Sequence, residues 1–314
     1  MKISRFAFIV SLGLILFSAG CGNVSLPFLA TETPTPTLTS TPTLTATATV
    51  TPSPTITPTF TPSPIPTATW VVQGPTLVRI PIILYHRIAV SPINSDYYVP
   101  PEHFEEQMKL LHDWGYATIT TQMLVQAIQE GIALPPRPIL ITFDDGTQSI
   151  YDSALPVMRK YGFTGVAYIV NNYMNSQDQL YMRPEQVKQL AAAGWEIGSH
   201  SLSHPPDLIT FAPERQRNEV VESRKQLEAE LGVPVLSFAY PFGVLDGSIV
   251  DYVHYAGYIA AMGLGPTVDQ GVGNLFNLQR RDIKGSYDLG RFASFLPWQG
   301  DPAFLPTVTP TPTP

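Results

Sequence analysis

The residues with the clearest chemical potential are two adjacent carboxylates, Asp144 and Asp145, which follow the apolar run Ile139–Phe143 and precede Gly146. Two carboxylates side by side at the end of a buried strand repel each other and lose hydration. A cation beside them removes that cost, and Gly146 lets the backbone turn sharply there. The pair indicates a cation site, although a helix N-cap with a second, uninvolved acid would give the same sequence.

Two histidines four residues apart, His200 and His204, follow another apolar run. Their spacing predicts that both imidazoles lie on one side of a helical turn, within reach of one metal ion. With an aspartate they form a two-histidine, one-carboxylate set, which suits Zn²⁺ or another divalent metal. The alternative is a solvated turn stiffened by Pro205 and Pro206. Because the chain has one cysteine, the metal would have to be held by histidine and carboxylate.

A third histidine, His86, ends the apolar run Ile80–Tyr85. This position favours either a role in a site at the end of the strand or a buried histidine that bonds a neighbour, and both interpretations stay open. The other three histidines, His103, His112 and His254, fall within expected helices among polar residues. We interpret them as ordinary surface or boundary side chains.

The elements that must position these side chains alternate between short apolar runs and helical stretches. The expected strands are Ile80–Tyr85, Ile139–Phe143, Val166–Val170, Trp195–Ser199 and Val235–Tyr240. The expected helices are Pro101–Trp114, Pro184–Ala193, Pro213–Leu231 and Ser248–Ala256. This alternation predicts an α/β fold with a parallel sheet, open or closed into a barrel. Parallel strands end on one face, so the polar residues that follow them are expected to converge on one pocket.

Three motifs resemble those of the polysaccharide deacetylase (NodB-homology) family, carbohydrate esterase family four. They are Thr142–Gly146, His200–His204 and Phe238–Gly243, and the resemblance covers residues 78–298. It implies an α/β fold of the distorted (β/α)7-type barrel. It also implies one divalent metal ion as cofactor, which is usually Zn²⁺ in this family.

The resemblance further assigns roles to matching residues. It implies that Asp145, His200 and His204 are the metal ligands and that Asp144 is the general base. Backbone N–H groups around Tyr240 and Phe242 are implied to help hold the oxyanion, and Pro241 between them belongs to the same substrate-binding segment.

Two positions depart from the common pattern of the family. Ala239 stands where many members carry an arginine that orients the base, and no histidine follows His254, so the usual C-terminal Leu-x-His motif is absent. A subgroup that resembles bacterial exopolysaccharide deacetylases carries this histidine near the first strand, in a phrase like Leu84–Arg87. That likeness implies that His86 is the general acid. Two polar residues after a late strand are expected to support the site, and they are Arg280 and Asp282.

The implied function is a metal-dependent hydrolase that removes N-acetyl groups from a cell-surface or extracellular amino-sugar polysaccharide. Peptidoglycan, poly-N-acetylglucosamine and chitin-like polymers all fit as substrates. The alternatives are a catalytically inactive glycan-binding surface protein, including an adhesin with a vestigial deacetylase fold, and an esterase that removes O-acetyl groups from xylan-like polymers. We expect a monomer.

The N-terminus has the pattern of a secretory signal over residues 1–20. Lys2 and Arg5 precede the apolar run Phe6–Phe17, and the small residues Ser18–Gly20 precede Cys21. The small residues followed by cysteine resemble a bacterial lipobox, which implies lipidation of Cys21 and a membrane anchor. The alternative is ordinary signal cleavage with an incidental cysteine. Either reading predicts a secreted protein, and the first places it on the outer face of the cytoplasmic membrane or the cell surface.

Composition divides the rest of the chain into three parts. Residues 21–75 are dominated by threonine and proline, which predicts an extended, disordered linker. Residues 76–301 are expected to form the deacetylase domain, and residues 302–314 a threonine- and proline-rich tail. The formal net charge of −7 argues against a nucleic-acid partner, because such proteins carry basic patches.

Overall fold

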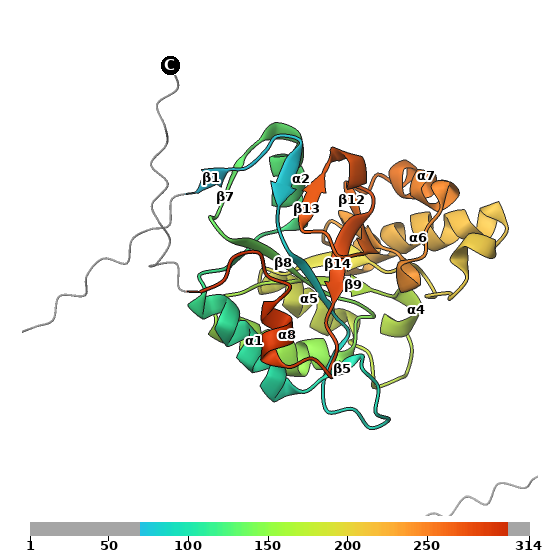
Figure 1. The fold of residues 1–314 in the computed structure, drawn as a ribbon. Coiled ribbons are helices and arrows are strands. Elements are labelled where there is room, and N and C mark those ends of the chain that lie inside the picture. The colour runs from blue at the N-terminus through green and yellow to red at the C-terminus, as the bar shows by residue number, and fades with distance from the viewer. Residues whose placement is uncertain (1–69, 301–314) are drawn as a thin grey trace, which may run out of the picture. The chain divides into compact units, whose positions relative to one another are not determined.

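Seven parallel strands close into a barrel within residues 70–300, the part of the chain that the computed structural model describes (Figure 1). The predicted signal, Cys21, most of the linker and the tail lie outside these residues. The barrel strands are β3 (Ile82–Tyr85), β8 (Pro138–Phe143), β9 (Val166–Ile169), β10 (Glu196–Ser199), β11 (Ser237–Ala239), β12 (Ala260–Leu264) and β14 (Leu278–Asp282). Strand β3 pairs with β14 on one side and β8 on the other, which closes the ring. The predicted α/β fold of the distorted (β/α)7 type is confirmed.

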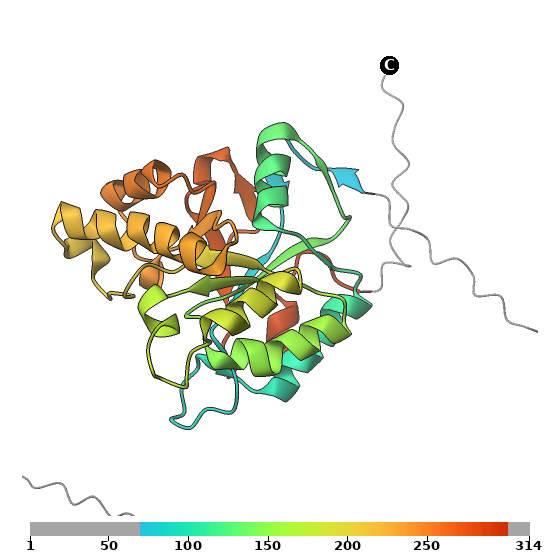
Figure 2. The same cartoon turned by 180° about the vertical axis from the view of Figure 1, so that it is seen from behind.

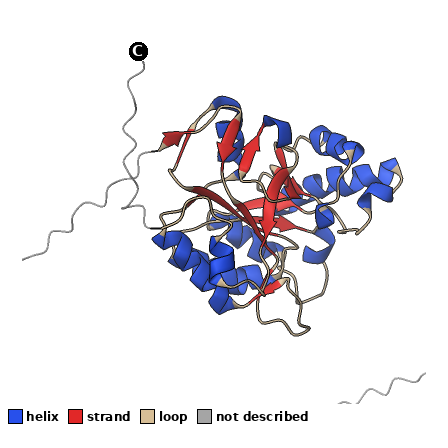
Figure 3. Cartoon of the chain, in the orientation of Figure 1, coloured by secondary structure: helices blue, strands red, loops and turns tan. Residues whose placement is uncertain are grey.

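Helices cover the outside of the barrel (Figures 2 and 3). They are α1 (Pro101–Asp113), α2 (Thr121–Glu130), α3 (Leu155–Lys160), α4 (Asn171–Met174), α5 (Pro184–Ala192), α6 (Pro213–Leu231), α7 (Gly247–Tyr255) and α8 (Leu289–Ala293), with short turns η1 (Ile150–Ala154), η2 (Leu208–Thr210), η3 (Pro241–Gly243) and η4 (Val272–Asn274). Neighbouring helices touch around the ring, with α8 on α1, α1 on α3, α5 on α6 and α6 on α7.

Sequence signals set several of the helix ends. Helix α6 has the predicted bounds, and it stops where Gly232 adopts a left-handed backbone with φ of 71°. Helix α2 begins where the Thr120 hydroxyl accepts a hydrogen bond from the Met123 N–H, and it stops at Gly131 with φ of 73°. The ends of these helices are therefore set by residues next to them in the sequence, and not by packing against the barrel alone.

Short strands lie at the rims of the barrel. They are β1 (Val71–Val72) with β7 (Ala133–Leu134), β2 (Leu77–Arg79) with β13 (Asp269–Gly271), β4 (Arg87–Ile88) with β5 (Tyr98–Val99), and β6 (Ala117–Thr118) beside the start of β8. The predicted single strand Ile80–Tyr85 is wrong in its first part. The chain leaves β2 at Arg79, and β3 starts only after Pro81, which has no N–H to offer a ladder.

The barrel strands bury alternate residues on opposite sides, as their two-residue period requires. Ile83 and Tyr85 belong to the apolar cluster that the outer helices share, whereas Ile82 belongs to a second cluster with Leu140 and Leu278. These last three side chains face the barrel interior. Positions two and four residues further along the same strands therefore face inward near the carboxyl end.

No helix within residues 70–300 combines the length and the apolar character needed to cross a bilayer.

Candidate active site

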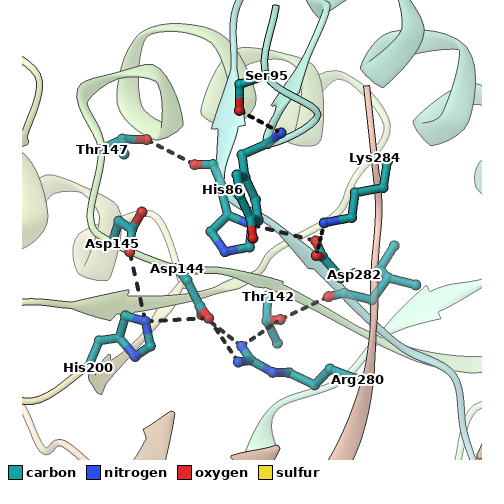
Figure 4. Close-up of polar contacts among 12 residues, drawn as sticks. His86, Ser95, Thr142, Asp144, Asp145, Thr147, His200, Arg280, Asp282 and Lys284 are labelled. Atoms are coloured by element: carbon teal, nitrogen blue, oxygen red, sulfur yellow. Dashed lines mark hydrogen bonds and ion pairs between the residues drawn. The ribbon is translucent and has the colours of Figure 1, made fainter. Parts of the chain in front are cut away.

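The inward-facing positions at the carboxyl end of the barrel carry the polar residues of the predicted site (Figure 4). His86, Asp144 and Asp282 each lie four residues, or two strand periods, after an inward-facing residue. These inward-facing residues are Ile82 on β3, Leu140 on β8 and Leu278 on β14. Strand pairing aligns these positions, because Leu84 lies opposite Thr142 on one side and Asp282 on the other. The period of the strands is thus what gathers side chains that are far apart in the sequence.

A possible metal-binding group consists of Asp145, His200 and His204, whose nearest ligand atoms all lie within 4.8 Å of one another. The two imidazole Nε2 atoms are 3.1 Å apart, and Asp145 Oδ1 lies 3.8 Å from His200 Nε2 and 3.6 Å from His204 Nε2. One carboxylate and two imidazoles at such distances can share a divalent ion and leave open positions on it. The three predicted ligands therefore meet in space.

The backbone reaches this arrangement through tight turns and not through a helical turn. Asp145 has φ of 70° and is followed by Gly146 with φ of 67°, so the chain reverses directly after β8. Ser201 and His204 also have positive φ, 68° and 54°. The helical turn predicted for the two histidines is wrong, because the Ser201 hydroxyl accepts the His204 N–H and bends the loop back instead. Non-glycine residues in this conformation carry strain, which is typical of functional sites.

Hydrogen bonds orient both histidines. His200 Nδ1 donates to the Ala239 carbonyl at 2.8 Å, which leaves its Nε2 lone pair directed at the ligand group. The loop that carries His204 is held by Glu219 of α6, whose carboxylate accepts bonds from the Ser203 N–H and hydroxyl at 2.9 and 2.6 Å. Burial and the neighbouring His200 keep the pKa of His204 below its ordinary value, so the ring is neutral and able to bind a cation.

The second carboxylate, Asp144, is held by an arginine from the other side of the barrel. Arg280 places Nη1 and Nη2 at 2.7 and 2.8 Å from the two oxygens of Asp144, and both side chains are almost fully buried. Burial raises the pKa of Asp144, but Arg280 and His200 outweigh this effect and lower it to about 2. Asp144 is therefore ionised at neutral pH, and its Oδ2 lies 3.6 Å from His200 Nε2.

The second predicted catalytic residue, His86, faces a carboxylate of β14. His86 Nδ1 lies 3.6 Å from Asp282 Oδ1, and Lys284 Nζ lies 2.5 Å from the other oxygen of Asp282 (Figure 4). The His86 main chain is anchored by the Thr147 hydroxyl, which donates to its carbonyl at 3.0 Å. Arg280 and Asp282, which were expected after a late strand, lie within β14, beside Asp144 and His86 respectively.

Within the described residues, only one of the three residues predicted from the third motif offers the free backbone N–H group that was expected of this segment. The Tyr240 N–H donates to the Met262 carbonyl at 3.2 Å within the sheet, and Pro241 has no N–H, so neither can donate to an oxyanion. The Phe242 N–H has no acceptor among residues 70–300. Phe242 adopts φ of 58°, and its ring lies 4.7 Å from that of His204. Of the three predicted residues, Phe242 alone has an N–H available to a ligand.

A pocket connects these groups and is bordered by residues that sequence reasoning missed. Its wall includes all predicted ligands, His86, Asp144, Arg280 and Asp282, and adds Arg87, Tyr97, Gly243 and Leu264. Tyr97, Phe242 and Leu264 are 49%, 54% and 44% exposed, so the mouth of the pocket is partly apolar. Lys284 and Glu219 were missed because each acts from a neighbouring loop or helix, without a motif of its own. His103, His112 and His254 are exposed, in agreement with their interpretation as surface residues.

Comparisons with known proteins agree with this geometry. Residues 131–261 match the family model described as Polysaccharide deacetylase. The YxkH protein of Bacillus subtilis is 29% identical over 193 residues, which are 61% of this chain and 66% of that protein. A poly-beta-1,6-N-acetyl-D-glucosamine N-deacetylase of Staphylococcus aureus is 22% identical over 174 residues, which are 52% of this chain and 60% of that protein. The chain therefore spans less than two thirds of the length of these two relatives.

A solved structure supports the fold. The Streptococcus pyogenes deacetylase PplD in complex with acetate superposes with a TM-score of 0.64 at 23% identity, covering 70% of this chain and 99% of that one. The closed barrel of residues 70–300 therefore has the fold of that solved structure. Residues 131–261 of this barrel match the polysaccharide deacetylase model, which agrees with the resemblance inferred from the three motifs.

Proposed function

We propose that this protein is a metal-dependent hydrolase that removes N-acetyl groups from an amino-sugar polysaccharide. One observation carries the proposal: a group able to hold a metal lines the same pocket as an ionised carboxylate, Asp144, and the histidine His86. Hydrolysis of an acetamide needs a base on one side of the carbonyl and an acid on the leaving-group side.

The residues of the ligand group fit a divalent ion, and Zn²⁺ suits two imidazoles and one carboxylate. Asp145, His200 and His204 would hold it, with His200 fixed in the required tautomer by the Ala239 carbonyl. When bound, such an ion supplies Lewis acidity toward the acetyl oxygen and lowers the pKa of water.

The protein's own groups would then handle the protons. Asp144 accepts the proton of the attacking water, and its bidentate bond to Arg280 keeps the carboxylate ionised and fixed in place. His86 donates a proton to the departing amine, which leaves poorly without one. The Phe242 N–H, which has no acceptor among residues 70–300, donates to the oxygen on which negative charge develops.

Release of acetate from a panel of glycans tests this proposal. The panel contains peptidoglycan, poly-N-acetylglucosamine, chitin oligomers and acetylated xylan, each assayed with added Zn²⁺ and with chelator. We expect chelator-sensitive acetate release from at least one N-acetylated glycan. Asp144→Asn should keep bound zinc and lose about 10²–10⁴-fold in turnover, as expected for a lost general base.

Two results would contradict the proposal. A folded, zinc-loaded chain that binds glycans and releases no acetate would favour the inactive glycan-binding alternative. Release from acetylated xylan alone would make the protein an O-acetyl esterase. The relative from Staphylococcus aureus, whose name specifies poly-beta-1,6-N-acetyl-D-glucosamine, makes that polymer the first substrate to assay.

The proposed location is extracytoplasmic, with the domain tethered by a lipid on Cys21. The supporting pattern is the apolar run Phe6–Phe17 followed by small residues and the cysteine. Mass spectrometry of the mature N-terminus tests it. A diacylglyceryl-modified Cys21 is expected, and an unmodified N-terminus at this or another position would contradict the anchor.

A further inference from the structure

Lys284 lies immediately behind the pair formed by His86 and Asp282. Its Nζ is 2.5 Å from Asp282 Oδ2, while the other oxygen of Asp282 faces His86 Nδ1 at 3.6 Å. The lysine side chain is 25% exposed, and Asp282 is 20% exposed. One carboxylate is thus shared between an ammonium and the imidazole that is the proposed acid.

Tyr97 joins the lysine to the histidine on the other side. The Lys284 ammonium lies 4.3 Å from the centre of the Tyr97 ring, and that ring lies 4.8 Å from the His86 ring at 63°. Cations are attracted to aromatic faces, which stabilises the tyrosine in this position. Tyr97 also lines the pocket, so the contact fixes part of the wall next to the acid.

The backbone keeps the two segments together. The Gly285 N–H donates to the Asp96 carbonyl at 2.9 Å, and a side chain at position 285 would meet the Tyr98 carbonyl at 1.9 Å. The loop before β5 and the segment after β14 are therefore in direct contact. This contact holds the backbone of Lys284 close to Tyr97 and Asp282.

We propose that Lys284 is a positioning residue that acts on His86 through Asp282 and Tyr97, and this inference rests on the proposed function. Its ammonium offsets the charge of Asp282 and holds that carboxylate beside the imidazole. An imidazolium beside an unopposed carboxylate gives up its proton less readily. Lys284 thus keeps His86 able to protonate the amine.

Other charged and titratable groups surround His86, and their contributions must stay constant in a test. They are Asp144 at the end of β8, Arg87 on β4, His204 in the loop after β10 and Arg280 on β14. Lys284 is separate from these groups because its contacts run to Asp282 and Tyr97. Burial lowers the pKa of Lys284, but Asp282 outweighs this and raises it, so the ammonium persists across the pH range of an assay.

The test compares two substrates that differ in their need for an acid. The first is an N-acetylglucosamine oligomer, whose amine must be protonated. The second is 4-nitrophenyl acetate, whose phenolate leaves without protonation. We expect Lys284→Met in the zinc-loaded protein to lower kcat on the amide by about tenfold, which is less than the loss expected when a general acid is removed altogether. The KM for the amide should not change, and turnover of the ester should stay within about twofold. The alkaline limb of the amide pH profile should move upward by roughly half to one pH unit.

Control variants separate this role from a structural one. Lys284→Arg keeps the charge and should restore most of the amide activity. Lys225→Met removes an exposed lysine that pairs with Glu222 on α6, and it should change neither substrate. An equal loss on both substrates, or no loss on either, would overturn the inference.

A second measurement does not depend on turnover. NMR titration of the His86 ring should show a higher midpoint in Lys284→Met than in the unchanged protein, and an unchanged midpoint would overturn the inference. If the unchanged protein hydrolyses neither substrate, the proposed function fails, and the titration still tests whether Lys284 influences His86 through Asp282 and Tyr97.

Discussion

Arg280 supplies the positive side chain that is missing at position 239, where this chain has alanine. The sequence has Ala239 where many members of the family carry an arginine, and Arg280 of β14 instead reaches Asp144, the proposed base, across the barrel interior. It also donates to the Gly263 carbonyl at 3.2 Å, so the guanidinium has little freedom. The same charge therefore reaches the same carboxylate from a different strand.

The buried pair of Arg280 and Asp144 should dominate local stability. Arg280→Met leaves an unpaired buried carboxylate, and we expect a loss of about 3–5 kcal/mol in the free energy of unfolding, measured by urea denaturation. Arg79→Met is the matched control, because Arg79 pairs with Asp269 at the surface and should change stability little. Equal effects of the two substitutions would contradict the role given to the buried pair.

The pKa of Asp144 gives a second prediction at this scale. Its value in the folded state, about 2, lies below the ordinary value of 3.8, so ionised Asp144 stabilises the fold above about pH 4. That contribution is lost as the pH falls toward 2, and it amounts to about 2 kcal/mol. Denaturation of the metal-free protein between pH 5 and pH 2 should show this loss in the unchanged chain and not in Asp144→Asn. Parallel curves for the two proteins would count against it.

Among the elements, helix α6 holds the loop that carries His204, a role that no motif in its sequence indicates. Its Glu219 is 5% exposed and anchors the loop that carries His204 through two bonds to Ser203. Residues that orient metal ligands in this way support metal affinity. The length of α6 and its end at Gly232 are therefore part of how the ligand group is placed.

Removal of this anchor should weaken metal binding. We expect Glu219→Ala to lower zinc affinity by about 10- to 100-fold, measured by competition with a chromophoric chelator, while Glu219→Gln keeps one acceptor and gives a smaller loss. Glu222→Ala, one turn further along α6 in the pair with Lys225, should leave zinc affinity unchanged. Unaltered affinity in Glu219→Ala would mean that the loop holds its shape without the helix.

The elements also show why the sequence predicted some parts of the site and not others. Asp144, Asp145 and His200 were found because they follow short apolar runs, and His204 because it lies four residues after His200; both are local signals. Strand β14 reads Leu-Gln-Arg-Arg-Asp, and only its pairing with β3 and β12 shows that Arg280 faces the interior. The loop shape at His204 depends on Glu219, which is 15 residues away, so spacing alone suggested a helical turn.

At the scale of the whole domain, the ligand group joins two separate loops of the barrel, which follow β8 and β10. A metal that binds the folded state alone stabilises it by mass action, by about 3 kcal/mol when its concentration is 100-fold above the dissociation constant. We expect chelator to lower the melting temperature of the unchanged chain and to have little effect on His204→Ala. A melting temperature insensitive to chelator in the unchanged chain would argue against metal binding.

The pairing of β3 with β14, which closes the barrel, has a consequence for incompletely synthesised or truncated chains. Strand β3, which His86 follows, is the first barrel strand to be synthesised, yet β14, one of its two neighbours in the barrel, is the last. A polypeptide that stops before residue 278 has the proposed ligands and the proposed base but lacks both Arg280 and Asp282. On the proposed mechanism we therefore expect truncated products to release no acetate, because hydrolysis would need both ends of the barrel.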